Sequence, residues 1–374
     1  MVKKKVFEEE IMPEFNLKKR AVEDFLQKYC LDGLLLQRSS SFAWATCGAA
    51  SYINRASSFG EAKLLYLQDK WYLITNNIEI TRLEKEEKLY KQDWDFVVTP
   101  WYEGGDRLAK LCKGLKVGTD ATSENYLDIS DDFARIRANL TPQEGDRFRV
   151  LGRICGTAMS DAARKVHPGQ TEFEIAGLIS AETEKRGVQV VVNLVATDER
   201  IFNFRHPLPT DKILEQYAML ILCGRKDGLN CSITRFVHFG SLSNEIREKA
   251  VALAEVDAEF IAATRPGRSL RDVFQQGIDA YKRVGYPEEW KLHHQGGPAG
   301  YEPREFVATL DVQDLVTIGQ VYAWNPSITG TKSEDTILIG QYENEVLTGI
   351  EDWPTIDVDI RGNKYSRPAI LEIE

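Results

Sequence analysis

The chain has 374 residues, a formal net charge of −10 and a sequence pI of about 5.3. This length exceeds one typical core, so we expect two domains. An acidic surface repels polyanions, which argues against a nucleic-acid partner and against an acidic membrane surface. No apolar run reaches membrane-spanning length, and no signal peptide is visible behind the charged N-terminus. The six cysteines form no CxxC pair, which is typical of thiols in a reducing cytosol, so we expect a cytoplasmic protein.

Residues 1–139 are expected to form a smaller α/β domain. The sequence alternates segments typical of helices with short apolar segments typical of strands. In chain order these are a helix at 17–30, two strands around a polar turn at 63–75, a strand at 95–102, a helix around 106–113 and a strand at 115–121. Short strands that alternate with helices predict a mixed sheet.

A second domain is expected over residues 140–374, because clear helix-start chemistry appears at its beginning. Thr141 is a candidate N-cap, Pro142 stands at the first helical position, and Glu144 follows three residues after the cap. The boundary is therefore placed between residues 139 and 140.

Two segments of this second region, 168–187 and 266–285, echo each other. Each has a Pro-Gly pair, a Thr or Ser cap, an acidic residue three positions later, and a closing glycine after about four helical turns. Each also follows a long helical segment and precedes strand-like segments. A helix–helix–sheet unit that occurs twice predicts an α+β domain with two halves related by a pseudo-two-fold axis.

The stretch MLILCGRKDGLNCSITR, residues 219–235, predicts a β-hairpin. Apolar residues lead to an Asp-Gly turn at Asp227 and Gly228, which is a strong hairpin pattern. The strands carry a thiol at Cys223 and a hydroxyl at Ser232, and no carboxylate.

Residues 140–374 resemble the pita-bread fold of methionine aminopeptidase, aminopeptidase P, prolidase and creatinase. Residues 17–139 lie where the last three carry their smaller N-terminal domain. The matching segments follow the family's order along the chain: HPLPTDK (206–212), DGLNCSITR (227–235), HHQGGPAGY (293–301), WNP (324–326) and SEDT (333–336). The resemblance implies a pita-bread domain behind a creatinase-like α/β domain, in a homodimer whose N-terminal domain helps to close the partner's pocket.

The peptidases of this family bind two divalent metal ions through two aspartates, one histidine and two glutamates, and the ions activate a water molecule and polarise the scissile carbonyl. The resemblance places the histidine on His294 and the last glutamate on Glu334, so two of the five ligands are retained. It places the first glutamate on Asn325, which is neutral.

The two aspartate positions have also lost their carboxylates. The second falls on Ser232. The first falls on Ile221 in a gapless count, or on Cys223 if a small gap is allowed. Divalent ions need charged oxygen ligands or several imidazoles to replace their water, so we expect a degenerate site that binds no metal.

One metal-binding alternative is left open. A single transition metal bound by Cys223, His294 and Glu334 would have a thiolate–imidazole–carboxylate ligand set.

Creatinase hydrolyses a C–N bond without metal, with a histidine as acid and base, and the resemblance carries this histidine over to His206. An unperturbed histidine titrates near pH 6.5, which suits proton transfer in the cytosol. We expect His294 and Glu334 to complete the catalytic set by orienting the substrate or a water molecule. His293 is expected to be structural, because neighbouring residues on a strand point to opposite faces.

Further pocket residues are expected to bind the substrate. Tyr301 stands where the family has a second pocket histidine, Arg304 matches a Tyr-x-x-Arg-Glu segment of creatinase, and Arg235 is a candidate for an anionic group. The full set of expected substrate-binding residues is Asn325, Ser232, Cys223, Tyr301, Arg304 and Arg235.

The expected activity is metal-independent hydrolysis of a C–N bond in a small, amino-acid-like molecule or short peptide. Two alternatives come from other classes. One is an Xaa-Pro-type peptidase with an altered mononuclear metal site, and the other is a non-catalytic binding module.

Overall fold

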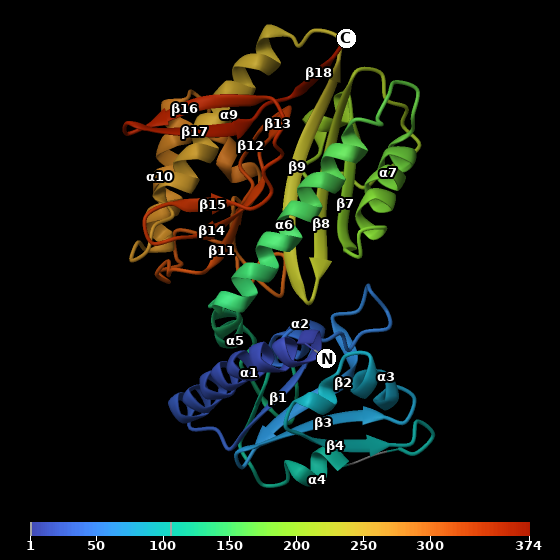
Figure 1. The fold of residues 1–374 in the computed structure, drawn as a ribbon. Helices are drawn as coiled ribbons and strands as arrows, with labels where there is room; N and C mark the ends of the chain where they lie inside the picture. Colours follow the sequence, from blue (N-terminus) through green and yellow to red (C-terminus); the bar gives the residue numbers. More distant parts are fainter. Residues whose placement is uncertain (1, 105–106) are drawn as a thin grey trace. The chain divides into compact units, whose positions relative to one another are not determined.

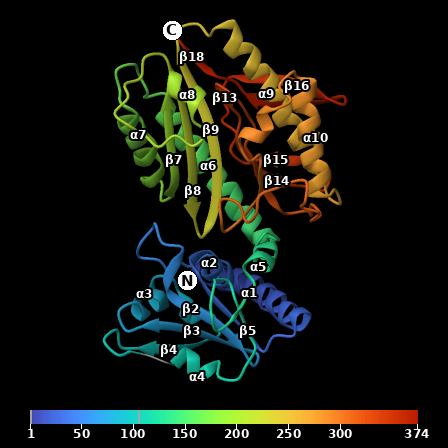
Figure 2. The same cartoon turned by 180° about the vertical axis from the view of Figure 1, so that it is seen from behind.

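The computed structural model describes residues 2–104 and 107–374, with side chains from Pro13 onward. The chain divides into two compact units, one that ends at Arg137 and one that begins at Ala138 (Figures 1 and 2). Each unit has its own sheet structure. Over the described ranges, no helix is both long and apolar enough to cross a bilayer.

The first unit is built on a mixed six-stranded sheet in the order β4-β3-β2-β1-β5-β6. The predicted pair of strands at 63–75 is confirmed, and the turn between them has positive φ angles at Gln68 and Asp69. The predicted helix at 17–30 is part of a longer helix. The elements are α1 (Val2–Tyr29), β1 (Gly33–Arg38), α2 (Ser39–Ala45), β2 (Phe59–Leu67), β3 (Lys70–Asn76), α3 (Ile80–Lys85), η1 (Leu89–Lys91), β4 (Trp94–Thr99), α4 (Arg107–Leu111), β5 (Val117–Thr119), β6 (Leu127–Asp128) and α5 (Ser130–Arg137).

The first half of the second unit begins with the predicted capping box. The Thr141 hydroxyl accepts a hydrogen bond from the backbone N–H of Glu144, whose carboxylate accepts one from the Thr141 N–H at 2.6 Å. Two helices, α6 and α7, pack against an antiparallel sheet of β7, β8 and β9 (Figure 1). The elements of this half are α6 (Pro142–Ala163), α7 (Glu172–Glu184), β7 (Gln189–Thr197), α8 (Glu199–Asn203), β8 (Tyr217–Lys226) and β9 (Leu229–Phe239).

The second half repeats this order with two helices, α9 and α10, and the antiparallel strands β10, β11 and β14. Its elements are α9 (Asn244–Ala263), α10 (Leu270–Arg283), η2 (Glu289–Leu292), β10 (Gly296–Ala299), β11 (Val321–Trp324), β12 (Ser327–Ile328), β13 (Thr331–Lys332), β14 (Asp335–Ile339), β15 (Asn344–Val346), β16 (Thr355–Ile360), β17 (Asn363–Pro368) and β18 (Leu371–Ile373). The last strand, β18, pairs with β9 of the first half.

Matching backbone hydrogen bonds confirm the predicted internal repeat. Before α7, the N–H of Gly169 donates to the carbonyl of Leu214 at 2.9 Å; before α10, that of Gly267 donates to Val316 at 2.8 Å. The two N-cap residues form equivalent antiparallel bridges, Thr171 with Ile213 and Ser269 with Leu315. The two halves therefore share their local connections as well as their order of elements.

The two halves meet where β9 passes the start of β14. The N–H of Thr234 donates to the carbonyl of Glu334 at 3.1 Å, and the Thr336 hydroxyl exchanges hydrogen bonds of 2.9 Å with the N–H and carbonyl of Ser232. These contacts place two positions singled out in the sequence, 232 and 334, on adjoining backbones.

A buried ion network lies beside this junction. The carboxylate of Asp335 accepts from Arg235 at 2.9 Å and from Arg367 at 2.6 Å, and Arg367 also donates to Asp257 at 2.7 Å. All four side chains are at most 2 % exposed. This network fixes the residue that follows Glu334.

Candidate functional site

A cavity of about 130 Å³ lies at the junction of the two halves. A single water molecule needs roughly 10–15 Å³ on the same measure, so the cavity has room for a small molecule. Its apolar lining residues are Val192, Leu194, Ile221, Leu222 and Pro303. Its polar and ionisable lining residues are His206, Cys223, Ser232, His294, Arg304, Asn325, Lys332 and Glu334.

The predicted hairpin is confirmed and forms one wall. Its two-residue turn has positive φ angles at Asp227 (50°) and Gly228 (77°), which match the right-handed twist of the flanking strands. The register sets Cys223 directly opposite Ser232, and both line the cavity. Ile221 also lines it, two residues earlier on the same strand face.

The carboxylate of Glu334 is held by two cations and a hydroxyl. Arg304 Nη2 donates to Oε1 at 3.0 Å, while Oε2 accepts from the Thr234 hydroxyl at 2.6 Å and lies 3.2 Å from Lys332 Nζ. The side chains of Arg304, Lys332 and Glu334 are 10 %, 6 % and 5 % exposed, so these ion pairs are shielded from solvent.

This environment fixes the charge of the group. Burial alone would raise the pKa of the Glu334 carboxyl, but Lys332 and Arg304 lower it to about 2. Burial lowers the pKa of the Lys332 ammonium, and Glu334 opposes that shift. Glu334 is therefore ionised at neutral pH, and the cavity lining holds a lysine and an arginine against this one carboxylate.

Two buried polar atoms of the lining are left without a partner. Among the described residues, neither Nε of Arg304 nor Oδ1 of Asn325 has a hydrogen-bond partner. Buried polar groups are normally paired, so such atoms are candidates for contacts with a ligand. One is a donor and the other an acceptor, so they suit a ligand that carries both kinds of group.

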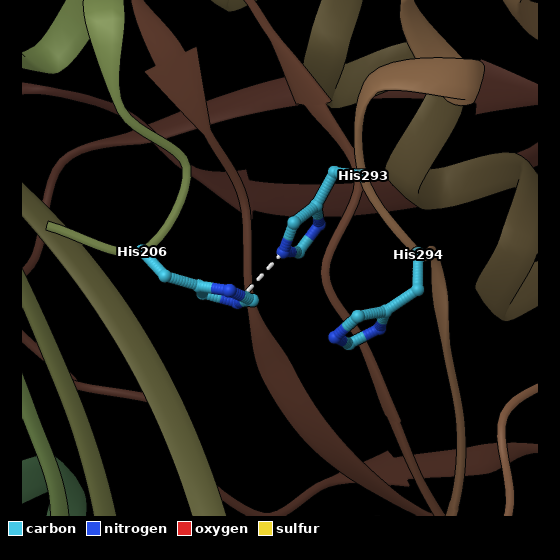
Figure 3. A group of neighbouring side chains, drawn as sticks. All are labelled: His206, His293 and His294. Atoms are coloured by element: carbon cyan, nitrogen blue, oxygen red, sulfur yellow. Dashed lines mark hydrogen bonds between the residues drawn. The ribbon is translucent and has the colours of Figure 1, made fainter.

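Three histidines converge beside the cavity, and two of them, His206 and His294, line it (Figure 3). The Nε2 atoms of His206 and His293 lie 2.9 Å apart, so one ring donates and the other accepts a hydrogen bond. The rings of His293 and His294 stack with centroids 4.4 Å apart, and those of His206 and His294 are 5.8 Å apart. His206 and His294 are exposed, and His293 is partly buried.

All three imidazoles have a lowered pKa. The His206 ring is only partly removed from water, and this partial desolvation together with the charge of Lys332 lowers its pKa; the same two causes lower the pKa of the more buried His293 to about 2. Burial and the charge of Arg304 lower the pKa of His294 to about 4. The three rings are therefore neutral at pH 7.

The expectation that His293 and His294 point in opposite directions is wrong. The two residues lie between η2 and β10, before the strand begins, so strand alternation does not apply to them. His293 sits in a bend, and the stacked rings face His206 together (Figure 3).

Of the nine residues expected to act in catalysis or binding, seven line the cavity: His206, His294, Glu334, Asn325, Ser232, Cys223 and Arg304. Arg235 and Tyr301 do not line it. Arg235 is held in the buried ion network by Asp335, and the Tyr301 hydroxyl donates to Glu144 at 2.6 Å. Their expected contacts with substrate receive no support from these positions.

Lys332 was missed in the sequence, although a pattern for it is present. It stands two residues before Glu334 in an extended segment, and residues i and i+2 of a strand share a face. The retained glutamate therefore pointed to a lysine beside it.

The residues present do not fit the family's dinuclear metal centre. Ser232 and Asn325 are neutral, and the position of the first aspartate is Ile221 or Cys223. Both oxygens of the retained Glu334 are engaged by protein groups, two of which are cations. A divalent ion there would have to displace these cations without gaining carboxylate ligands.

The alternative set of Cys223, His294 and Glu334 fits no better. All three line the cavity, but Glu334 is already paired. Burial raises the pKa of the Cys223 thiol to about 12, whereas a metal ligand must be the thiolate.

Comparisons with known proteins agree with this fold. The chain is 23% identical to an uncharacterized peptidase of Staphylococcus epidermidis over 61% of its length and 67% of the relative's. It is 22% identical to a Xaa-Pro dipeptidase of Pyrococcus furiosus over 61% of its length and 68% of the relative's.

Solved structures cover more of the chain. A Xaa-Pro dipeptidase from Bacillus anthracis superposes with a TM-score of 0.79 at 18% identity, over 96% of this chain and all of the other. A prolidase from Pyrococcus horikoshii gives 0.76 at 19% identity, over 89% and 98%. The N-terminal domain of the FACT complex subunit SPT16 from chickpea gives 0.71 at 12% identity, over 91% and 97%.

The sequence profile of metallopeptidase family M24 matches residues 146–343, which include most of both halves of the repeat and every residue that lines the cavity. The order of the matching motifs, the internal repeat and this profile lead to one conclusion: the chain belongs to metallopeptidase family M24.

Proposed function

We propose that this chain is an M24-family hydrolase that cleaves a C–N bond of a small, amino-acid-like molecule without the dinuclear metal centre. The observation that carries the proposal is the pairing of Glu334 with Arg304 and Lys332. In the metal-dependent peptidases of this family, the glutamate at the position matched by Glu334 is a metal ligand. Here the protein's own cations balance its charge.

The proposed acid and base is His206. Its imidazole is neutral at pH 7, lines the cavity and is held by the 2.9 Å contact with His293. As a base it takes a proton from a water molecule that attacks the carbon of the C–N bond. As an acid it returns that proton to the departing nitrogen, so the carbon gains a hydroxyl group and the nitrogen a hydrogen.

Residues deeper in the cavity orient the substrate in this scheme. Arg304 and Lys332 outnumber Glu334, so an anionic group of the substrate is favoured in the lining. The unpaired Nε–H of Arg304 suits a carboxylate, and the unpaired Oδ1 of Asn325 suits an N–H or O–H of the same molecule. His294 and Glu334 fix the attacking water or the substrate amine. A molecule that carries both an amine-type donor and a carboxylate meets these requirements.

The test is turnover of chelator-treated protein on a panel of small amides, amidines and ureas, each offered with and without a carboxylate. We expect hydrolysis of carboxylate-bearing members, unchanged by chelator. His206→Gln should lower kcat by at least about 100-fold, the typical contribution of a positioned acid or base. His167→Gln is the matched control, because His167 is exposed and outside the cavity lining.

Two results would contradict the proposal. One is activity that is lost with chelator and restored by added metal, which favours the alternative Xaa-Pro-type peptidase. The other is tight binding of panel members to the unaltered chain and to His167→Gln with no turnover by either, which favours the alternative binding module. The pairing of both Glu334 oxygens with protein groups is also compatible with that second alternative, so binding and turnover should be measured on the same samples.

A further inference from the structure

We propose that His206, His293 and His294 bind one divalent transition-metal ion, at a three-imidazole site that shares only His294 with the five ligand positions of the dinuclear centre. Three of the chain's five histidines are gathered here from two separate segments. One ligand nitrogen from each ring lies within 4.8 Å of the other two. Among the described residues, this is the one group of three or more histidine, cysteine, aspartate or glutamate side chains whose ligand atoms are close enough to bind one metal ion.

The spacing suits a tetrahedral ion. Metal–nitrogen bonds of about 2.0–2.1 Å put neighbouring ligand nitrogens about 3.3 Å apart. The His206–His293 pair is already at 2.9 Å, so it needs to open slightly, and the remaining distances need to close by at most about 1.5 Å through side-chain rotation. The three rings point toward a common space between the segments that carry them (Figure 3). A fourth position is left for water or a ligand.

Both histidine-bearing segments are tied together by a hydrogen-bonded support. Arg205, next to His206, donates to Glu289 of η2 at 2.7 Å and to the Thr329 hydroxyl at 2.9 Å. Thr329 in turn donates its N–H to Glu289 at 3.0 Å. This support holds the residue beside His206 close to the short helix that leads to His293.

A second support fixes the backbone at His293 itself. The side-chain amide of Gln295 donates to the carbonyl of His293 at 2.6 Å and to that of Trp290 at 3.1 Å, and its oxygen accepts from the buried hydroxyl of Tyr281 at 2.8 Å. Groups that position ligands in this way are a usual part of metal sites.

The donor set selects the kind of metal. Three imidazoles without a carboxylate favour Zn²⁺, Co²⁺, Ni²⁺ or Cu²⁺ over Mg²⁺ and Ca²⁺, which need oxygen ligands. Lys332 and Arg304 oppose a dication nearby, and Glu334 offsets part of their charge. The exposure of His206 and His294 gives an ion a path from solvent.

If His206 is the acid and base of the proposed function, an ion at this site inhibits hydrolysis. A metal ion bound to His206 holds this imidazole at the ion, away from the water molecule that it activates during hydrolysis. Zn²⁺ should therefore inhibit the enzyme reversibly, and chelator should restore turnover.

The experiment is a titration of untagged, chelator-treated full chain with Co²⁺, followed by visible absorption and by plasma mass spectrometry after dialysis. We expect one Co²⁺ per chain with a tetrahedral spectrum, unaffected by excess Mg²⁺. His293→Ala should weaken binding by at least about 10-fold, as should His206→Ala from the other segment. Folding of both variants is checked by circular dichroism.

His167→Ala and His238→Ala are matched controls, because each removes a histidine outside the proposed site. Nδ1 of His167 lies 3.0 Å from the carbonyl of Pro168, and Nδ1 of His238 lies 2.9 Å from that of Gly240. Both should bind Co²⁺ like the unaltered chain. Absence of Co²⁺ binding, or equal loss in controls and site variants, overturns the inference. Binding that depends on His293 together with activation by Zn²⁺ keeps the site and overturns the metal-free function.

Discussion

The ammonium group of Lys332 lies 3.2 Å from Oε2 of Glu334 in the wall of the cavity. With Arg304 on the other oxygen, the one glutamate retained from the family's ligand set is paired with protein cations on both sides. A carboxylate buried in this way needs its charge balanced, and the lysine and arginine supply that balance.

Removal of the lysine charge should destabilise the fold. Lys332→Met leaves Glu334 buried with one cation fewer, and breaking a buried pair of this kind costs about 3–5 kcal/mol. The free energy of unfolding in urea measures the loss. Lys364→Met is the matched control, because its ion pair with Asp357 is 71 % and 47 % exposed and should contribute little. Equal effects of the two substitutions would contradict the account.

The pH dependence of hydrolysis should follow His206. Burial and Lys332 lower the pKa of this imidazole, so the basic form persists and kcat/KM should fall only below the ordinary histidine pKa of about 6.5. Lys332→Met removes a positive charge, which raises the pKa of His206 and moves the acid limb to higher pH. The measurement is the kcat/KM profile in chelator-containing buffer. An acid limb that moves to lower pH in Lys332→Met would rule out this assignment.

Restoration of one family ligand should not restore metal binding at the positions of the dinuclear centre. In Ser232→Asp the new carboxylate lies beside Arg304, whose Nη1 is 3.4 Å from the present hydroxyl, so the two should form an ion pair. Mn²⁺ prefers carboxylate oxygens to imidazoles, so it reports on the family's ligand positions rather than on the three histidines. Its binding, followed by the electron paramagnetic resonance of the free ion, should stay absent. The triple variant Ser232→Asp, Arg304→Ala, Lys332→Ala frees the carboxylates and should bind Mn²⁺. Tight binding by the single variant would show that the cations do not exclude metal.

The ion network behind Glu334 should control stability in a pH-dependent way. Burial alone would raise the pKa of Asp335, but Arg235 and Arg367 lower it. A carboxyl pKa that is lowered in the folded state stabilises the fold at every pH above the group's ordinary pKa. This contribution is lost as the pH falls from that value through the lowered pKa of the folded state. Arg367→Met should therefore cost about 3–5 kcal/mol at pH 7 and less in acid. Arg361→Met is the control, because the Arg361 side chain is 57 % exposed. A stability difference between the unaltered chain and Arg367→Met that grows in acid would contradict the predicted sign.

Much of the fold could be predicted because its determinants are local. The Asp227-Gly228 turn, the Thr141 capping box and the paired Pro-Gly helix starts each depend on a few neighbouring residues, and the structure confirms all of them. The cavity lining was predicted in large part because the family's motifs fixed which strands and loops converge.

The errors and omissions depend on contacts between distant segments. Whether Arg235 faces the cavity depends on Asp335, a hundred positions away, which captures its guanidinium. The orientation of His293 depends on a bend before β10 and on Gln295, which a rule of strand alternation cannot include. The pairing of Lys332 with Glu334 could be predicted from their spacing in the sequence. That both oxygens of Glu334 are paired, which opposes metal binding, depends also on Arg304 from another loop.

A metal count on the full chain shows directly whether the dinuclear centre has been lost and whether the three histidines bind an ion in its place. Protein dialysed against excess Co²⁺ and then against metal-free buffer is measured by plasma mass spectrometry, with His206→Ala/His293→Ala in parallel. We expect one ion per chain in the unaltered protein, at the three histidines, and none in the double variant. Two ions per chain that survive the double substitution would show that the dinuclear centre persists, and would contradict this expectation.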